Sequence, residues 1–169
     1  TLNDPSTRNS LSEAMMAALA SVLASAATDR DVRAIVLAAT GPAFSSGPNL
    51  KEITAHRRAA DGGAAYFAKL FDQCAALMTS IVRHPKPVIA EVNGLASAAG
   101  CQLVASCDRA YAAYTASFCT PGVNIGLFCS TPMVALSRNV TPKHAMEMLL
   151  TGDVIGARQA QAIGLINQA

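Results

Sequence analysis

The stretch that most constrains the fold runs from Lys86 to Asp108 and reads KPVIAEVNGLASAAGCQLVASCD. Its apolar, β-branched run at 88–92 predicts a buried strand of a parallel sheet. A loop of small residues follows, and a helix is predicted over Ser97–Ala105. Because the first amides of a helix have no intrahelical acceptor, this strand-loop-helix unit directs N–H donors into a pocket.

Apolar runs alternate with helical patterns along the rest of the chain, which predicts an α/β fold with short crossovers. Further strands are expected at 32–38, buried on both faces, at 109–113, just before a Pro-Gly corner at 121–122, and at 165–166. Helices are expected from a serine cap at 10–12 to 28, over 66–83, from 130, over 143–150 and over 157–163, with loops at 41–50 and 57–63. We expect one domain over residues 1–169, apparently truncated at both ends.

Composition excludes several classes of function. The net charge is only +2 and the basic residues are scattered, so nucleic acid is not an expected partner. No run is apolar enough to cross a membrane and no signal peptide opens the chain, which predicts a cytoplasmic protein, or a matrix protein if the source has mitochondria. Five cysteines without CxxC spacing indicate a reducing compartment. The three histidines lack metal-ligand spacing, so no metal is expected.

Several motifs occur in an order that resembles the crotonase superfamily, the enoyl-CoA hydratase/isomerase family. They are Asn3-Asp4-Pro5 with Arg8-Asn9, Ala43-Phe44-Ser45-Ser46-Gly47 with Leu50-Lys51-Glu52, the stretch 86–108, Pro121 to Gly126, Thr151-Gly152 and Gly164-Leu165. Each motif alone is weak, but together they cover essentially the whole chain. The wording CQLVASCD and GLFCSTPMVALSR is most similar to the branch called enoyl-CoA hydratase domain-containing proteins.

The resemblance implies a spiral of ββα repeats, with the family's usual C-terminal helical segment missing here. It implies a CoA thioester as substrate or ligand with no other cofactor, a role in fatty acid metabolism, and a homotrimer or a hexamer of paired trimers. The positions expected near CoA are Arg8, Ser45, Ser46 and Lys51. The alternative is that Arg8 and Lys51 are solvent-exposed charges without a ligand, and that the two serines serve the backbone geometry of their loop.

The family's chemistry stabilises an oxyanion with two backbone N–H groups. The resemblance maps one donor to Ala99, where Ala98 and Ala99 replace the usual glycines. It maps the other donor to Pro48, and proline has no N–H. Either another amide of this loop serves, or the oxyanion hole has a single donor.

Hydration in this family normally needs two glutamates to activate water and deliver a proton. The resemblance maps their positions to Gln102 and Gly122. A glutamine amide does not exchange a proton near neutral pH, and glycine offers only backbone. We therefore expect the family label of a lyase but not the standard two-glutamate hydration.

Two hypotheses remain open on the sequence. The chain is either an acyl-CoA enzyme that transfers protons in another way, or a non-catalytic acyl-CoA binder or oligomeric partner. Cys119 and Cys129 flank the strand predicted on the pocket side and are candidate nucleophiles. Because no histidine lies near either in sequence, the expected role of both thiols is packing.

Overall fold

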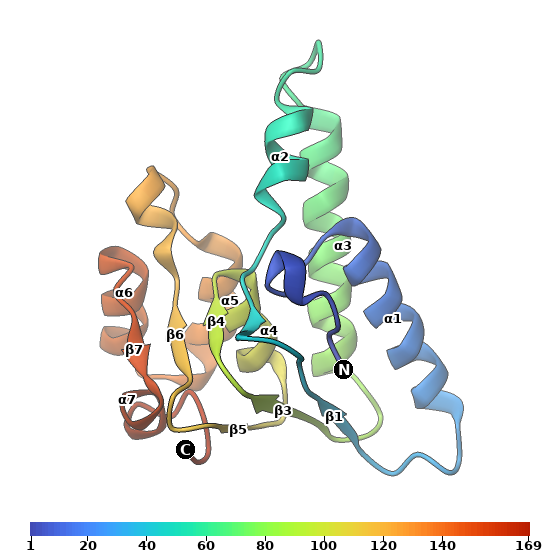
Figure 1. Ribbon diagram of the computed structural model, residues 1–169, viewed down its shortest axis with the longest axis vertical. Coiled ribbons are helices and arrows are strands. Elements are labelled where there is room, and N and C mark those ends of the chain that lie inside the picture. The colour runs from blue at the N-terminus through green and yellow to red at the C-terminus, as the bar shows by residue number, and fades with distance from the viewer.

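The computed structural model describes all residues, 1–169. An N-terminal helix is followed by three successive ββα units, the first of which has two helices, and then by two helices and a short strand (Figure 1). The first unit contains β1 (Ile35–Leu37), β2 (Ala43–Ser45), α2 (Leu50–His56) and α3 (Ala64–Val82). The second contains β3 (Val88–Val92), β4 (Leu95–Ser97) and α4 (Ala99–Ser106). The third contains β5 (Arg109–Ala112), β6 (Ser117–Cys119), the 3-10 turn η2 (Pro121–Ile125) and α5 (Ser130–Asn139).

The remaining elements lie at the two ends of the chain. A 3-10 turn, η1 (Pro5–Thr7), and α1 (Glu13–Thr28) precede the first unit, and α6 (Pro142–Thr151), β7 (Ile155–Gly156) and α7 (Ala157–Ala162) follow the third. The hydroxyl of Ser12 caps α1 by accepting a hydrogen bond from the Met15 amide at 3.1 Å. Pro142 occupies the first position of α6, where its missing N–H costs nothing.

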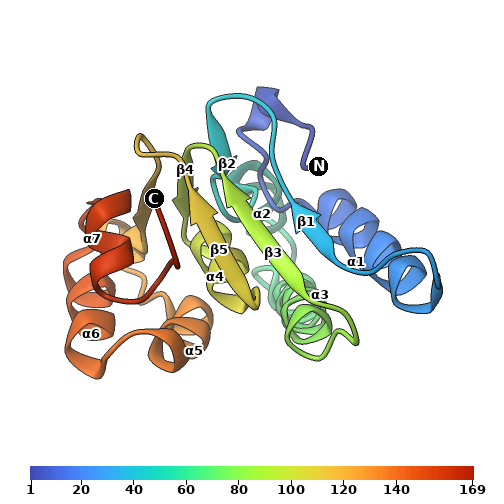
Figure 2. The same ribbon diagram turned by 90° about the horizontal axis from the view of Figure 1, so that it is seen from below.

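The strands form two sheets, and each ββα unit contributes one strand to each of them. The first sheet has the order β1-β3-β5 and is wholly parallel, as Figure 2 shows from below. The second has the order β2-β4-β6-β7, parallel except for the β6–β7 pair. This arrangement is the predicted spiral of ββα repeats.

Helix α4 is the centre of the molecule, and all eight of its residues are buried. It packs against α3, α5, β2 and β4. Phe44 and Phe118 are fully buried on the strands beside it, and each such side chain stabilises the fold by roughly 2–3 kcal/mol. By contrast, α2 and the adjoining end of α3 project from the rest of the molecule (Figure 1). None of the helices is both long and apolar enough to span a bilayer.

Several sequence predictions were wrong in detail. The strand predicted at 32–38 is shorter, and Val36 is 54% exposed, because helices cover only one face of its sheet. The loop predicted at 41–50 contains β2, and the helix predicted from Ser97 begins at Ala99 because β4 continues to Ser97. Residues 165–166 form no strand but are buried, and Gln168 pairs with Tyr111 instead.

Candidate functional site

The predicted site residues meet at one edge of the second sheet. Since β2, β4 and β6 are neighbouring parallel strands, their carboxyl ends lie at the same edge. Gly47 and Pro48 follow β2, Ala99 follows β4, and Gly122 follows β6. The carboxyl ends of parallel strands are where α/β folds bind ligands.

The start of α4 presents unpaired backbone donors at this edge. Its N-cap, Ala98, has φ 49° and ψ −118°, and its side chain makes no capping hydrogen bond. The amide of Ala98 donates to the Cys119 carbonyl at 2.9 Å, which fixes the turn against β6. Ala99 is then the first helical residue, and its N–H belongs to the group that no intrahelical acceptor satisfies. The helix dipole adds partial positive charge at this end, so an oxyanion would be stabilised there.

Gly47 lets the loop after β2 approach the start of α4. A Cβ atom at residue 47 would lie 2.7 Å from the carbonyl oxygen of Ser97 and 3.3 Å from the nitrogen of Ala99. Its φ of +87° is also one that side-chain-bearing residues rarely adopt. Only glycine therefore brings this loop so close to the Ala99 amide.

The same loop supplies no free amide at residues 46–48. The Ser46 amide donates to the Arg8 carbonyl at 3.0 Å, and the Gly47 amide donates to the Ser45 hydroxyl at 3.3 Å. Pro48 has no N–H and instead lies in a bridge with Leu11. The next two amides, those of Asn49 and Leu50, donate no hydrogen bond within the chain. Both alternatives left by the sequence therefore stay open: a single donor at Ala99, or a second donor from this loop.

Gln102 lies one turn along α4 from Ala99, on the same face of the helix. Only 6% of its surface is exposed, and its Oε1 atom is buried without any hydrogen-bond partner. A buried acceptor without a donor is costly in a folded chain, so this oxygen is a candidate contact for a ligand or a water.

Gly122 has no room for a side chain. A Cβ atom there would lie 2.5 Å from the carbonyl oxygen of Leu127 and 2.7 Å from the Sγ atom of Cys129. The Leu127 amide donates to the Gly122 carbonyl at 2.9 Å, so the loop closes on itself at this point. The space that a glutamate would need is therefore filled by the loop and by a thiol.

The four positions expected near CoA divide into two pairs. Arg8 and Lys51 are exposed, and neither forms an ion pair in the chain. Ser45 is fully buried, where its hydroxyl donates to the Asn9 carbonyl at 2.8 Å, while the Ser46 hydroxyl donates to the Thr7 carbonyl at 3.2 Å. The serines thus hold the loops together, and the two cations are available to an anionic ligand.

Sequence reasoning missed the part that Asn9 plays in supporting the site. Asn9 is fully buried with φ 53°, and its Nδ2 atom donates to the carbonyls of Thr40 and Ala43 at 2.8 and 2.9 Å. Its Oδ1 atom accepts from the Asp4 amide at 2.8 Å. These bonds tie the N-terminal segment to β2 and so help to fix the Gly47 loop. The Arg8-Asn9 pair was visible in the sequence, but only a contact map reveals why its asparagine matters.

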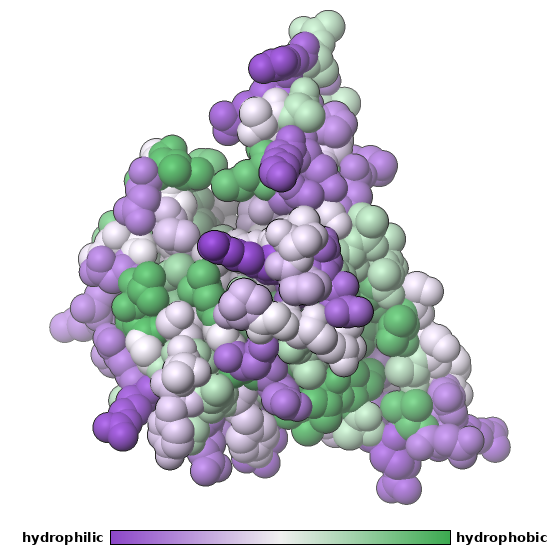
Figure 3. All heavy atoms as spheres, viewed as in Figure 1, coloured by the Kyte–Doolittle hydropathy of each residue, from purple (hydrophilic) through white to green (hydrophobic).

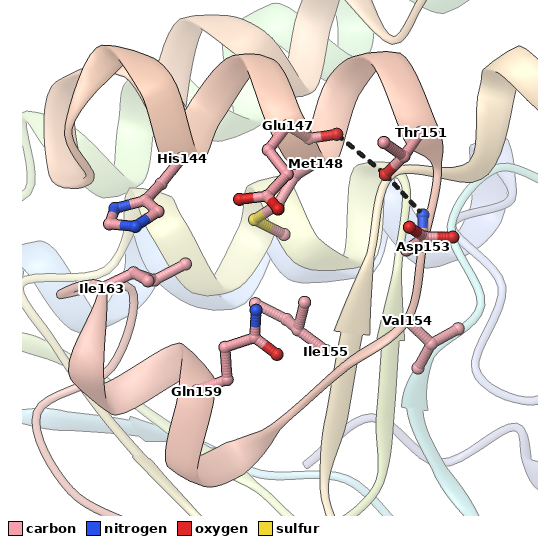
Figure 4. A pocket seen from close by; sticks show the side chains of 9 residues that line it. All are labelled: His144, Glu147, Met148, Thr151, Asp153, Val154, Ile155, Gln159 and Ile163. Atoms are coloured by element: carbon pink, nitrogen blue, oxygen red, sulfur yellow. Dashed lines mark hydrogen bonds between the residues drawn. The ribbon is translucent and has the colours of Figure 1, made fainter.

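A separate pocket of about 350 Å³ lies between α6 and α7 (Figure 4). His144, Glu147 and Gln159 are among the side chains that line it, and none of the predicted site residues does. The Thr151 hydroxyl beside it donates to the Glu147 carbonyl at 2.9 Å and accepts from the Asp153 amide at 3.2 Å. Its polar groups are therefore partly satisfied within the chain. No three His, Cys, Asp or Glu side chains gather anywhere as a metal site would require.

Comparison with known proteins shows which family this arrangement belongs to. The family model described as Enoyl-CoA hydratase/isomerase matches residues 1–169. The chain belongs to the enoyl-CoA hydratase/isomerase family. The resemblance drawn from its motifs is thereby confirmed, as is the α/β fold of the crotonase superfamily.

Within this family, the chain lies in the enoyl-CoA hydratase domain-containing branch. It is 52% identical over 167 residues to the human enoyl-CoA hydratase domain-containing protein 3, mitochondrial, covering 99% of this chain and 54% of that protein. It is 34% identical over 168 residues to the 2,3-dehydroadipyl-CoA hydratase of Escherichia coli, covering 99% of this chain and 63% of that enzyme. The chain thus spans about half the length of its human relative.

Solved structures of the family agree with the fold. The crystal structure of an enoyl-CoA hydratase from Mycobacterium smegmatis matches with a TM-score of 0.90 at 52% identity, over 97% of this chain and 62% of that one. The crystal structure of the human domain-containing protein 3 matches with a TM-score of 0.91 at 50% identity, over 98% of this chain and 65% of that one.

Proposed function

We propose that this family member binds an acyl-CoA thioester with its carbonyl oxygen on the Ala99 amide, and that it does not hydrate enoyl-CoA through a pair of carboxylates. The observation that carries this proposal is the pairing of a buried helix N-terminus with Gly122, where no side chain fits. The first feature suits a polarised thioester carbonyl. The second removes the group that standard hydration requires.

A single fixed donor is enough for recognition and for part of the catalytic stabilisation. One preorganised N–H in a dry site contributes roughly 3–4 kcal/mol to an oxyanionic transition state. Gln102 adds an acceptor oxygen without a partner, which can orient a water or a substrate hydroxyl. Proton transfer would then need the substrate or a water molecule, because neither Gln102 nor Gly122 supplies a carboxylate.

The exposed cations support the CoA part of the proposal. Arg8 directly precedes the buried Asn9, and Lys51 lies in the first turn of α2. Both lie on segments attached to the Gly47 loop, where they could meet phosphate groups. We further propose that the protein acts as a homotrimer or hexamer, and that it lies in the mitochondrial matrix if its source is a eukaryote. The word "mitochondrial" in the names of its relatives and the exposed apolar side chains of α6, Met146 and Leu150, support this.

Removing the Ala99 N–H tests the binding mode directly. Proline has no N–H, so Ala99→Pro deletes the donor, although the preceding residue, Ala98, with φ 49° and ψ −118°, must adjust to it. We expect acyl-CoA affinity to fall about tenfold or more, because one hydrogen bond to a charged or polarised group is lost. The matched control is Ala157→Pro, which makes the same change at the first residue of α7. Thermal unfolding of both variants checks that they fold.

The function itself is tested by calorimetric titration of acetyl-CoA and crotonyl-CoA into the full-length protein, with the enoyl absorbance followed in parallel. Binding without loss of the enoyl chromophore is the expected result. Binding with rapid hydration would overturn the argument from Gln102 and Gly122. If neither ligand binds, the acyl-CoA proposal itself is wrong and only the family and the fold stand.

A further inference from the structure

Three thiols lie around the carboxyl ends of β4 and β6. Cys101 is in the first turn of α4, Cys119 ends β6, and Cys129 is the N-cap of α5. The Cys119 thiol donates to the Ser97 hydroxyl at 3.4 Å, and the Sγ atom of Cys129 lies 2.7 Å from the position of a Cβ atom at residue 122. The cluster thus occupies the edge at which the Ala99 amide is presented.

Only one of the three thiols is suited to chemistry. Cys101 is fully buried, and burial raises its pKa far above the ordinary value, with a further rise from the neighbouring Cys119 and Cys129. Burial also raises the pKa of Cys119, although the bond to Ser97 opposes this. Burial thus disfavours the reactive thiolate form of both side chains. Cys129 packs against the core but is only partly buried and makes no hydrogen bond through its thiol, so it is the most exposed member of the cluster.

Two observations fit a ligand at this edge. The first is the buried Oε1 atom of Gln102, which has no hydrogen-bond partner in the chain. The second is the apolar rim next to Cys129, where Ile125, Leu127 and Phe128 are 66%, 54% and 40% exposed. Figure 3 shows hydrophobic surface over this connection between β6 and α5. An acyl chain with a polar thioester head matches that combination.

We propose that Cys129 accepts the acyl group of the bound thioester and forms an acyl-cysteine intermediate; this inference rests on the proposed acyl-CoA binding. The Cys129 sulfur attacks the acyl carbon, and the Ala99 amide stabilises the oxyanion of the tetrahedral intermediate. The bond between the acyl carbon and the CoA sulfur then breaks, and CoA leaves as a thiol with the proton that Cys129 released. One thioester replaces another, so the step needs no co-reactant and is reversible.

This assignment gives the thiol the place that the second carboxylate holds in the family pattern. The loop that fills the space at Gly122 also brings Cys129 to it, since the Leu127 carbonyl and the Cys129 sulfur are the two groups that a side chain at residue 122 would meet. The same loop conformation therefore leaves no room for a carboxylate at residue 122 and brings the thiol of Cys129 to that place.

The test is intact-protein mass spectrometry of the full-length protein incubated with butyryl-CoA, with released CoA measured by chromatography. A saturated acyl group is used because an enoyl group could also add to a thiol through its β-carbon. We expect one butyryl group per chain, one CoA released for each, removal of the adduct by hydroxylamine, and its complete loss in Cys129→Ala. The control variants Cys119→Ala and Cys74→Ala should retain the adduct, and excess CoA should reverse it.

Calorimetry on the same samples separates the two proposals. If wild-type protein and Cys129→Ala bind butyryl-CoA equally well but neither is acylated, acyl transfer is wrong and the binding proposal stands. An adduct that persists in Cys129→Ala also overturns the assignment. If no variant binds or is acylated, both proposals fail.

Discussion

The two sides of the candidate site are built from the same unit and differ in the segment that comes after its second strand. After β4 the chain turns within one residue into α4, a fully buried helix that keeps its first amides free. After β6 it enters η2 and a loop that folds back, so that the Leu127 carbonyl and the Cys129 thiol occupy the space beside Gly122. The α4 side thus presents free N–H donors, whereas the β6 side has no space for an acid-base side chain. Under the proposed function, binding and proton transfer would be separable properties of this fold.

The largest expected effect comes from crowding the α4 side at Gly47. Gly47→Ala would place a Cβ atom 2.7 Å from the Ser97 carbonyl oxygen at a φ of +87°. We expect a loss of about 3 kcal/mol in unfolding free energy from strain and overpacking together, measured by urea denaturation. Acyl-CoA binding should be lost as well. Gly62→Ala is the matched control, because Gly62 has φ +66° but no atom within 4 Å of its Cβ position.

A Gly47→Ala variant no less stable than Gly62→Ala would show that the Gly47 loop is free to move away from α4.

On the β6 side, restoring the carboxylate should cost stability without creating a hydratase. Gly122→Glu brings a Cβ atom within 2.5 Å of a backbone oxygen, so the loop must shift, at a cost of about 2 kcal/mol. The double variant Gln102→Glu, Gly122→Glu carries both carboxylates, yet we expect no loss of crotonyl-CoA absorbance. Gly156→Ala, with no atom near its Cβ position and no positive φ, controls for loss of a glycine. Hydration by the double variant would show that the loop can rearrange to the family's usual geometry.

Gln102 should show opposite effects on stability and on binding. Gln102→Met removes a buried oxygen that has no partner, and we expect unfolding free energy to rise by about 1 kcal/mol. Acyl-CoA affinity should fall at the same time. The counterpart is Gln73→Met on α3, since the Nε2 atom of Gln73 donates to the Glu13 carbonyl at 2.9 Å and its loss should destabilise the chain. A lower unfolding free energy for Gln102→Met would contradict the conclusion that the Oε1 atom of Gln102 has no hydrogen-bond partner.

The smallest effect is expected at the turn into α4. Ala98 has φ 49°, a conformation that favours glycine, so Ala98→Gly should relieve strain and raise unfolding free energy by about 0.5–1 kcal/mol. Ala99→Gly, one residue later and inside the helix, should instead lower it by a similar amount. Thermal denaturation of the two variants measures both changes in stability. Equal effects of the two changes would mean that the turn is not strained.

The sequence correctly predicted those helices and strands that a short stretch of residues determines on its own. The β-branched run at 88–92 is the strand β3 to the residue, and the helix predicted over 143–150 is α6, one residue longer at each end. The short strands β2 and β4 were not recognised, since their three residues each depend on pairing with distant chain segments rather than on composition. The same dependence explains why Val36 was predicted buried although one face of its sheet is open.

The site was predictable only as a set of positions. The motif order assigned Ala99, Gln102 and Gly122 to one pocket, and the structure brings their strands together at one sheet edge. The motifs do not reveal the contacts that decide the roles of these residues. The Ser45 hydroxyl that engages the Gly47 amide and the Cys129 thiol beside Gly122 depend on loop conformation, which no spacing rule gives.

The alternation of strands between two sheets also governs how the chain acquires its structure. Strands that follow one another within a unit, such as β1 and β2, belong to different sheets, and every hydrogen-bonded strand pair encloses at least one helix. No hairpin can therefore nucleate either sheet, and a topology dominated by distant contacts folds slowly. On a ribosome, each emerging unit would find its partner strands already in place only if the preceding unit had settled first. We therefore expect assembly to proceed from the N-terminus, one ββα turn at a time.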